Sequence, residues 1–269
     1  MRSDESGANH PRSHVASAID FSAIERYWET SAADYDDYLG GTDTAPQHRR
    51  AAEVRAWELL LRRILGPPPL RILDVGTGTG SLALLLALLG YQVTALDAAP
   101  HMLQVAAAKA ERLGLRLELR QGIAEDLPFE GGSFDAITCK LLLWTLLDPE
   151  AAVREWRRCV RPGGRIVAID GTHGQRENAL DRVRSAVAAR IHGHRDGYMQ
   201  HPEQIAQLPL WHINSPEAYR NVFVRAGLEQ VLVEELAGID VLERRQWTMW
   251  FRIWPRRAQY LIEGAVPSS

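Results

Sequence analysis

The stretch from Arg71 to Pro100, RILDVGTGTGSLALLLALLGYQVTALDAAP, constrains the fold of this chain more than any other part of it. A short apolar run leads into Gly76, Gly78 and Gly80, and a second apolar run ends at Asp97. Glycine tolerates positive φ and has no Cβ to obstruct a ligand. A glycine-rich turn from a strand into a helix is therefore typical of a nucleotide-like site. The stretch predicts a βαβ unit with a ligand at its first turn.

Alternating strands and helices continue on both sides of this stretch. Helix signals are clear, since Gly90 and Gly114 suit helix ends and Asp148 suits an N-cap before a proline. Repeated βα units with nearly continuous apolar strands predict an α/β fold, with a parallel sheet covered by helices on both faces. We expect strands at 71–75, 92–97, 115–121, 134–139, 165–170, 228–235 and near 257–263, and helices at 79–89, 100–113, 148–160, from Ser215 to Gly227, and at about 240–253.

The composition and patterning of the sequence divide the chain into three parts, the last of which contains an insertion. Residues 1–20 are polar and bury too little apolar surface to order themselves, which predicts a disordered tail. Residues 21–66 combine clustered aromatic residues with a helical apolar pattern and predict an N-terminal helical cap. Residues 67–269 are expected to form the ligand-binding domain. Its alternation of strand and helix patterns is interrupted at 171–214. Long connections of this kind often cover an active site, so we expect the insertion to act as a lid.

Composition narrows the classes of partner and location. The chain has 269 residues, of which 46% are hydrophobic, and a net charge of −3 with acids and bases interleaved, which argues against nucleic acid. The N-terminus lacks a signal peptide pattern, and the longest apolar run, Leu82 to Leu89, is too short to cross a membrane. We expect a cytoplasmic protein with no membrane partner and with reduced Cys139 and Cys159. The histidines show no metal-ligand spacing, so no metal is expected.

The spacing of the glycines discriminates between two kinds of ligand. Dinucleotide-binding turns use G-x-G-x-x-G, whereas this chain has G-x-G-x-G with Ser81 at the sixth position. Asp74 precedes the turn, and a carboxylate there would repel a pyrophosphate but would suit a ligand with an ammonium group. Asp97 does not discriminate, because an acid at this distance also serves NAD in dehydrogenases. An NAD-dependent oxidoreductase is therefore not favoured.

Four ordered segments resemble the motifs of class I S-adenosylmethionine (SAM)-dependent methyltransferases. ILDVGTGTG resembles their first motif, and VTALD places Asp97 where the family's acid binds both ribose hydroxyls. GIAEDLPF (122–129) resembles the third motif, and the segment from SFDAITCK to GGRIVAID resembles the fourth strand, the next helix and the fifth strand. The resemblance covers residues 70–170 and, more weakly, 215–263. The subgroup resembled is that of small-molecule methyltransferases of the quinone-biosynthesis type.

This resemblance implies a fold, a cofactor and a set of binding residues. The fold is a Rossmann-like, mostly parallel sheet of seven strands with one antiparallel edge strand, an N-terminal cap and an inserted lid. The activity is transfer of a methyl group from SAM to an O, N, S or C atom of a small molecule, with S-adenosylhomocysteine as product. The implied cofactor-binding residues are Tyr27, Tyr35, Asp74, Gly76, Thr77, Gly78, Gly80, Asp97, Ala98, Met102, Ile123, Ala124, Glu125, Cys139 and Lys140.

One position departs from the family pattern. Ile123 stands where the family usually has an acid that accepts from the adenine amino group. Glu125 is the first candidate to replace that acceptor. Lys140 has two further readings, contact with an anionic substrate or a plain surface charge. Met102 at helical spacing also fits a core position.

The acceptor pocket is expected from aromatic residues and histidines around the site. His173 directly follows the fifth strand and is the predicted general base, because histidine titrates near neutral pH. The expected pocket residues are Trp28, Tyr38, Trp144, His173, His192 and Trp211. Two alternatives to a methyltransferase remain: another SAM-binding enzyme on the same fold, or a non-catalytic SAM-binding regulatory subunit. The chain is expected to be a monomer or a homodimer.

Overall fold

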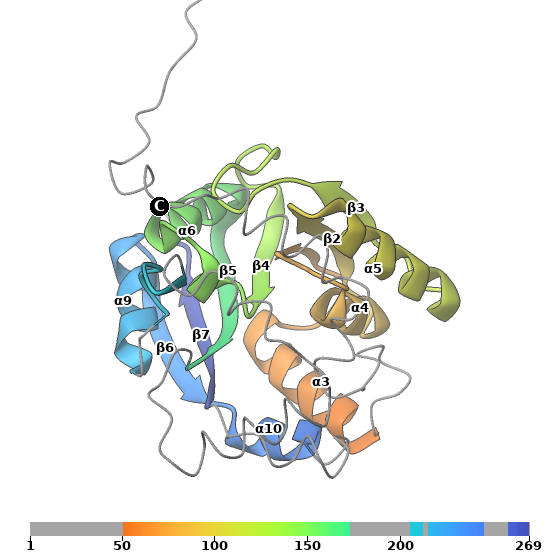
Figure 1. Ribbon diagram of the computed structural model, residues 1–269. Coiled ribbons are helices and arrows are strands. Elements are labelled where there is room, and N and C mark those ends of the chain that lie inside the picture. Colours follow the sequence, from red (N-terminus) through yellow and green to blue (C-terminus); the bar gives the residue numbers. More distant parts are fainter. Residues whose placement is uncertain (1–50, 173–204, 212–214, 245–257, 269) are drawn as a thin grey trace, which may run out of the picture.

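The computed structural model describes residues 51–172, 205–211, 215–244 and 258–268 (Figure 1). Its central feature is a seven-stranded sheet with the strand order β3-β2-β1-β4-β5-β7-β6. The strands are β1 (Arg71–Val75), β2 (Gln92–Asp97), β3 (Glu118–Gln121), β4 (Phe134–Lys140), β5 (Val160–Gly171), β6 (Glu229–Glu235) and β7 (Gln259–Ala265). Neighbours from β3 through β5 pair in parallel, and β7 is antiparallel to both β5 and β6. The predicted seven-stranded, mostly parallel Rossmann-like sheet is confirmed, and its antiparallel strand, β7, lies next to the edge strand β6.

Helices cover the sheet on two faces. They are α3 (Ala51–Leu65), α4 (Ser81–Leu88), α5 (Pro100–Leu113), α6 (Pro149–Cys159), α9 (Pro216–Arg225) and α10 (Ala237–Arg244), together with the short 3-10 helix η3 (Leu143–Thr145). Each face of the sheet packs against its helices in a large hydrophobic cluster of its own. One unites α6 and α9 with side chains such as Leu73 of β1, and the other unites α3 and α4 with Ile72. Adjacent residues of β1 thus enter opposite cores, as the period of two in a strand requires.

The ends of most elements follow the expected signals. Asp148 caps α6 by accepting from the Ala151 backbone N–H at 2.8 Å, and Ser215 caps α9 by accepting from the Glu217 N–H at 3.2 Å. Helix α4 begins at Ser81 rather than at residue 79, because Gly80 has a φ of 87° and cannot belong to the first turn. β5 begins at Val160, five residues before the expected start, since Val160 already pairs with Phe134 of β4.

Some expected elements lie outside the described residues. These are the tail 1–20, most of the cap 21–66, most of the insertion 171–214, and the segment after Arg244 of the Trp-rich helix. Within the described part, α3 lies in the range 21–66 that the sequence predicts to be a cap. The residues that are described include no helix that is both long enough and apolar enough to cross a membrane.

Candidate functional site

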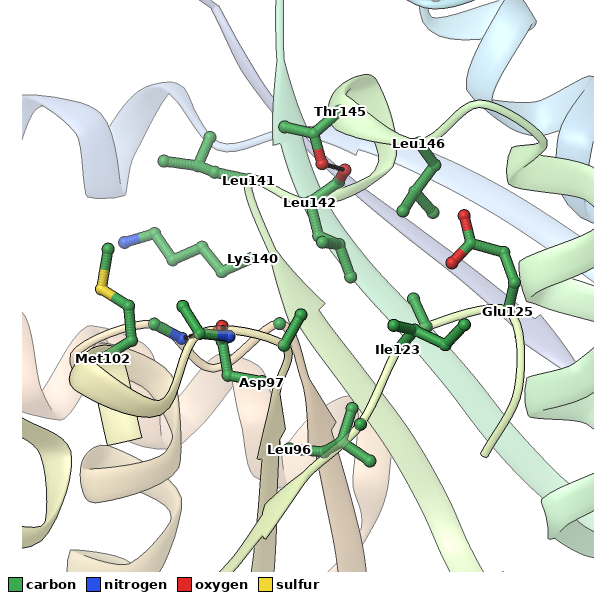
Figure 2. A pocket seen from close by; sticks show the side chains of 16 residues that line it. Leu96, Asp97, Met102, Ile123, Glu125, Lys140, Leu141, Leu142, Thr145 and Leu146 are labelled. Atoms are coloured by element: carbon green, nitrogen blue, oxygen red, sulfur yellow. Dashed lines mark hydrogen bonds between the residues drawn. The ribbon is translucent and has the colours of Figure 1, made fainter. Parts of the chain in front are cut away.

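A pocket opens at the carboxyl ends of β1, β2 and β4, where ligands bind in open α/β sheets (Figure 2). Four short segments supply its walls: the glycine turn after β1, the start of α5 after β2, the loop after β3 and the loop after β4. The lining residues are Gly76, Gly78, Leu96, Asp97, Ala98, Ala99, Met102, Gly122, Ile123, Ala124, Glu125, Lys140, Leu141, Leu142, Thr145 and Leu146.

The glycine turn is bare where it faces the pocket and crowded where it faces the loop after β4. A Cβ on Gly76 would lie 2.6 Å from Cδ1 of Leu142, whereas a Cβ on Gly78 would meet no atom within 4 Å. Both residues have positive φ, 63° and 55°. A side chain at Gly76 would collide with Leu142, whereas a side chain at Gly78 would occupy open space. Both residues also have the positive φ that glycine adopts readily.

Asp97 connects the end of β2 to this turn. One carboxylate oxygen accepts from the Gly78 backbone N–H at 2.7 Å, and the other accepts from the Ala99 N–H at 2.9 Å. The two amides fix the plane of the carboxylate at the pocket wall. A carboxylate has about four lone-pair positions, so both oxygens can also accept from two neighbouring hydroxyl groups. This is the acceptor pattern that a ribose diol needs.

Asp74 lies behind the glycine turn and is not among the lining residues. It is fully buried, and its two oxygens accept from the hydroxyls of Thr77 and Thr138, both at 2.7 Å. Burial raises the pKa of the Asp74 carboxyl to about 6, and the nearby charge of Asp97 acts in the same direction. In this structure the Asp74 side chain braces the turn from inside the protein.

The loop after β3 presents Ile123, Ala124 and Glu125 to the pocket. Ile123 and Glu125 lie across the pocket from Asp97 (Figure 2). Helix α6 holds this loop in place, because the Trp156 indole N–H donates to the Ala124 carbonyl at 2.8 Å and Glu155 accepts from the Leu127 N–H at 3.1 Å. Burial raises the pKa of Glu125 above its ordinary range, and the charge of Asp148 adds to the effect. Ile123 is 38% exposed, so the position of the family's usual acid faces the pocket with an aliphatic side chain.

The loop after β4 forms an aliphatic wall made of Leu141, Leu142 and Leu146. Leu141 has a φ of 57°, which is rare for a non-glycine residue and marks a constrained backbone next to the site. Thr145 also lines this wall, but its hydroxyl donates to the Leu142 carbonyl at 2.6 Å. The wall therefore offers mainly apolar surface to a ligand.

The expected site residues divide into three groups. The pocket brings together Gly76, Gly78, Asp97, Ala98, Met102, Ile123, Ala124, Glu125 and Lys140. Asp74, Thr77, Gly80, Cys139, Trp144 and Trp211 lie outside its lining. Tyr27, Trp28, Tyr35, Tyr38, His173 and His192 lie outside the described residues.

The residues outside the lining have structural contacts. Gly80 is the N-cap residue directly before α4, and Cys139 is fully buried in the core beside α6. Trp144 is buried, and its ring packs against Trp211 with the centroids 5.1 Å apart. Trp144 belongs to the core cluster that also holds Leu146, and Trp211 is partly buried and packs against that cluster.

Sequence reasoning missed seven lining residues: Leu96, Ala99, Gly122, Leu141, Leu142, Thr145 and Leu146. Leu96, Ala99 and Gly122 adjoin the ends of β2 and β3, and the rule that ligands bind at the carboxyl ends of strands could have found them. The aliphatic wall gave no such signal, because leucines after a strand are indistinguishable from core residues in a sequence.

The donor and acceptor groups of the pocket fit a nucleoside with a positively charged substituent. Asp97 suits a diol, Leu96 and Ile123 provide apolar surface for a base, and the turn around Gly78 leaves room for close approach. Asp97 and Glu125 are carboxylates at the pocket, which favour a cation and oppose a pyrophosphate.

Comparisons with known proteins agree with this chemistry. Residues 73–168 match the family described as methyltransferase domain. The chain is 34% identical to the demethylmenaquinone methyltransferase of Thermus thermophilus over 202 residues, which covers 71% of this chain and 88% of that protein. It is 33% identical to the ubiquinone/menaquinone biosynthesis C-methyltransferase of Methylobacterium nodulans over 199 residues, 68% of this chain and 77% of that protein.

A solved structure supports the fold. Phosphoethanolamine N-methyltransferase 2 of Haemonchus contortus, in complex with S-adenosyl-L-methionine, superposes with a TM-score of 0.61 over 93% of this chain and 60% of that chain. Its sequence identity is 17%, so the likeness concerns the fold alone.

The alignments cover most of the length of these two methyltransferases, so the two non-methyltransferase alternatives are not favoured. The protein is an enzyme that uses SAM as methyl donor and methylates a small molecule. By sequence, fold and site, the chain belongs to the class I SAM-dependent methyltransferases of the quinone-biosynthesis type.

Proposed function

We propose that the enzyme methylates a ring carbon of a reduced, apolar quinone, a hydroquinone of the naphthalene or benzene class. The observation that carries this proposal is the aliphatic wall of Leu141, Leu142 and Leu146, which suits an uncharged ring with an apolar substituent. The two relatives that cover most of the chain support it, since one is named for demethylmenaquinone and the other as a C-methyltransferase of quinone biosynthesis.

The residues that would hold SAM follow from the geometry of the pocket. Asp97 would accept from the two ribose hydroxyls, and Leu96, Ile123 and Ala124 would contact the adenine ring. Glu125 would accept from the adenine amino group in place of the missing acid at residue 123. Gly78 would let the methionine part pass close to the main chain, because no atom lies within 4 Å of its would-be Cβ.

SAM, when bound, supplies a methyl group attached to a positively charged sulfur, which becomes a neutral thioether as the methyl leaves. The protein residues contribute chiefly by position: a well-oriented pair of reactants gains up to about 7–11 kcal/mol over the same reaction in solution. The acceptor ring carbon must lose its proton after the new carbon–carbon bond forms. We keep His173 as the proposed base for that proton; it follows Thr172 at the end of β5 and lies outside the described residues.

Two cap residues, Tyr27 and Tyr35, remain proposed contacts of the cofactor, and Trp28, Tyr38 and His192 remain proposed contacts of the acceptor. All five lie outside the described residues, and their sequence context supports them. We also propose that nucleic acid is not a substrate, because the basic residues alternate with acids along the chain.

The experiment that tests the proposal is incubation of the full chain with methyl-labelled SAM and demethylmenaquinol under reducing conditions. We expect the label in a product that carries the methyl on the ring, identified by mass spectrometry and NMR. The oxidised quinone should not react, because its ring carbon is no longer a nucleophile. Label on a quinol oxygen, or reaction only with charged acceptors such as amino acids, would contradict the proposal.

A further inference from the structure

Lys140 is the one cationic side chain among the described residues that line the pocket. It ends β4, and its side chain runs along the pocket wall in the direction of Met102 (Figure 2). The SAM that the enzyme uses is itself positively charged at sulfur. An unscreened ammonium in the wall would therefore oppose the cofactor that the pocket must bind.

Glu243 of α10 neutralises this ammonium. Its Oε1 lies 3.3 Å from Lys140 Nζ, and the two side chains are only 14% and 16% exposed. Glu243 does not line the pocket itself. Its charge acts there through the lysine.

Further contacts hold the pair in place from two sides. The Gln259 amide N–H of β7 donates to the second oxygen of Glu243 at 3.4 Å. The Lys140 ammonium also lies 5.4 Å from the centre of the Trp57 ring of α3, a favourable cation–π distance. The ammonium is thus held between a carboxylate and an aromatic face, which fixes its distance from the pocket.

We propose that Glu243 sets the charge preference of the cofactor pocket: by neutralising Lys140, it lets the pocket favour cationic SAM over the product S-adenosylhomocysteine. Both molecules carry the same ammonium and carboxylate on their amino-acid part, and the formal charge that differs is the one on sulfur. A pocket that binds the donor better than the product releases the product more readily. Glu243 acts on the cofactor only through Lys140, whatever the identity of the methyl acceptor.

The competing role for Lys140, direct contact with the cofactor carboxylate, predicts a different result. SAM and S-adenosylhomocysteine share that carboxylate, so loss of such a contact weakens both to the same extent. The ratio of the two affinities therefore separates the two roles.

The experiment is calorimetric titration of the full chain with SAM and, separately, with S-adenosylhomocysteine. For Glu243→Gln we expect the Kd of SAM to rise about tenfold, the effect of one like charge roughly a nanometre away at intermediate dielectric. The Kd of S-adenosylhomocysteine should change less than about threefold. Lys140→Met in the same background should restore the wild-type ratio of the two affinities.

A control variant shows whether the loss of any ion-paired carboxylate has the same effect, and a second pair of variants serves if Glu243→Gln does not fold. Glu234→Gln removes the carboxylate of another ion pair, with Arg63, at more exposed side chains, and should leave both affinities unchanged. If Glu243→Gln does not fold, Lys140→Met alone is compared with the double variant, and the single variant should show the higher preference for SAM. Equal changes for the two ligands, or no change in either, would overturn the proposal.

Discussion

The carboxylate of Asp97 accepts a hydrogen bond from the backbone N–H of Gly78 at 2.7 Å, and this bond joins the end of β2 to the glycine turn after β1. Nineteen residues separate the two partners. This hydrogen bond connects the two loops that form one wall of the pocket. Asp97, which would bind the ribose, therefore also fixes the conformation of the glycine turn, which the rest of the cofactor would contact.

Asp97→Ala should abolish most of the affinity for SAM. The variant loses two charge-assisted hydrogen bonds to the ribose, each worth about 1.5–3 kcal/mol, so the Kd should rise by roughly a hundredfold or more. The fold should persist, because Asp97 lies at the rim of the sheet rather than in the core. Titration calorimetry and thermal unfolding check the two parts, with the exposed Asp126→Ala on the opposite loop as control. An unchanged Kd would refute the role of Asp97.

Three glycine-to-alanine variants should distinguish the effects of backbone strain, of a steric clash in the protein and of a steric clash with the ligand. Gly78→Ala should fold but bind SAM poorly, because its Cβ would project into open space at the pocket. Gly76→Ala should also lose stability, by about 1–3 kcal/mol, because its Cβ would lie 2.6 Å from Cδ1 of Leu142 and would force that side chain to move.

Gly114→Ala is the control for the backbone, since Gly114 ends α5 with a φ of 64°, has no atom near its would-be Cβ and does not line the pocket. It should lose only about 1 kcal/mol and keep full affinity. Urea unfolding and calorimetry measure both quantities. Equal affinity of the Gly78 and Gly114 variants for SAM would contradict the pocket geometry.

The stability of the enzyme should depend on pH through Asp74. Burial raises the pKa of this carboxyl from 3.8 to about 6, so folding favours the protonated form. Its contribution is fully present below the unfolded pKa and is lost as the pH rises from about 4 through about 6. The loss is on the order of 3 kcal/mol at neutral pH. Urea unfolding without cofactor, between pH 4 and 8, should show a decline that Asp74→Asn lacks.

Asp135 is a control of the opposite sign. Burial alone would raise the pKa of its carboxyl, but hydrogen bonds from the Arg161 side chain and the Arg71 backbone lower it below the ordinary range. Its contribution is therefore present at neutral pH and is lost as the pH falls through the folded pKa. Asp135→Asn should flatten the acid side of the stability curve and leave the decline above pH 4 intact. A decline that survives in Asp74→Asn would refute the assignment to Asp74.

Glu125 should strengthen the binding of ligands that carry the adenine amino group and not of ligands that lack it. Glu125→Ala should weaken S-adenosylhomocysteine about tenfold, the value of one hydrogen bond to a charged acceptor. Adding Ile123→Asp should recover much of that loss, since it restores an acid at an exposed lining position. The inosine analogue of S-adenosylhomocysteine carries a carbonyl in place of the amino group and cannot donate to Glu125, so its Kd should not rise in Glu125→Ala. Equal losses for both ligands would show that Glu125 acts only on the shape of the loop.

Local signals in the sequence were enough to predict the order of the elements and the location of the cofactor turn. Gly76, Gly78, Gly80 and Asp97 are local signals, because positive φ and an acid at the end of a strand follow from the residue types and their spacing. The caps at Asp148 and Ser215 are local for the same reason. These features needed no knowledge of distant contacts.

The surroundings of each side chain, by contrast, depend on contacts between distant parts of the chain. Asp74 resembles a ligand contact in the sequence, yet Thr138, 64 residues away, helps to enclose it within the protein. Lys140 could have been a surface charge, but Glu243, 103 residues later, pairs with it at the pocket. Such pairings depend on which strands and helices become neighbours in space. The packing of the whole sheet sets those neighbours, and no local pattern of residues encodes them.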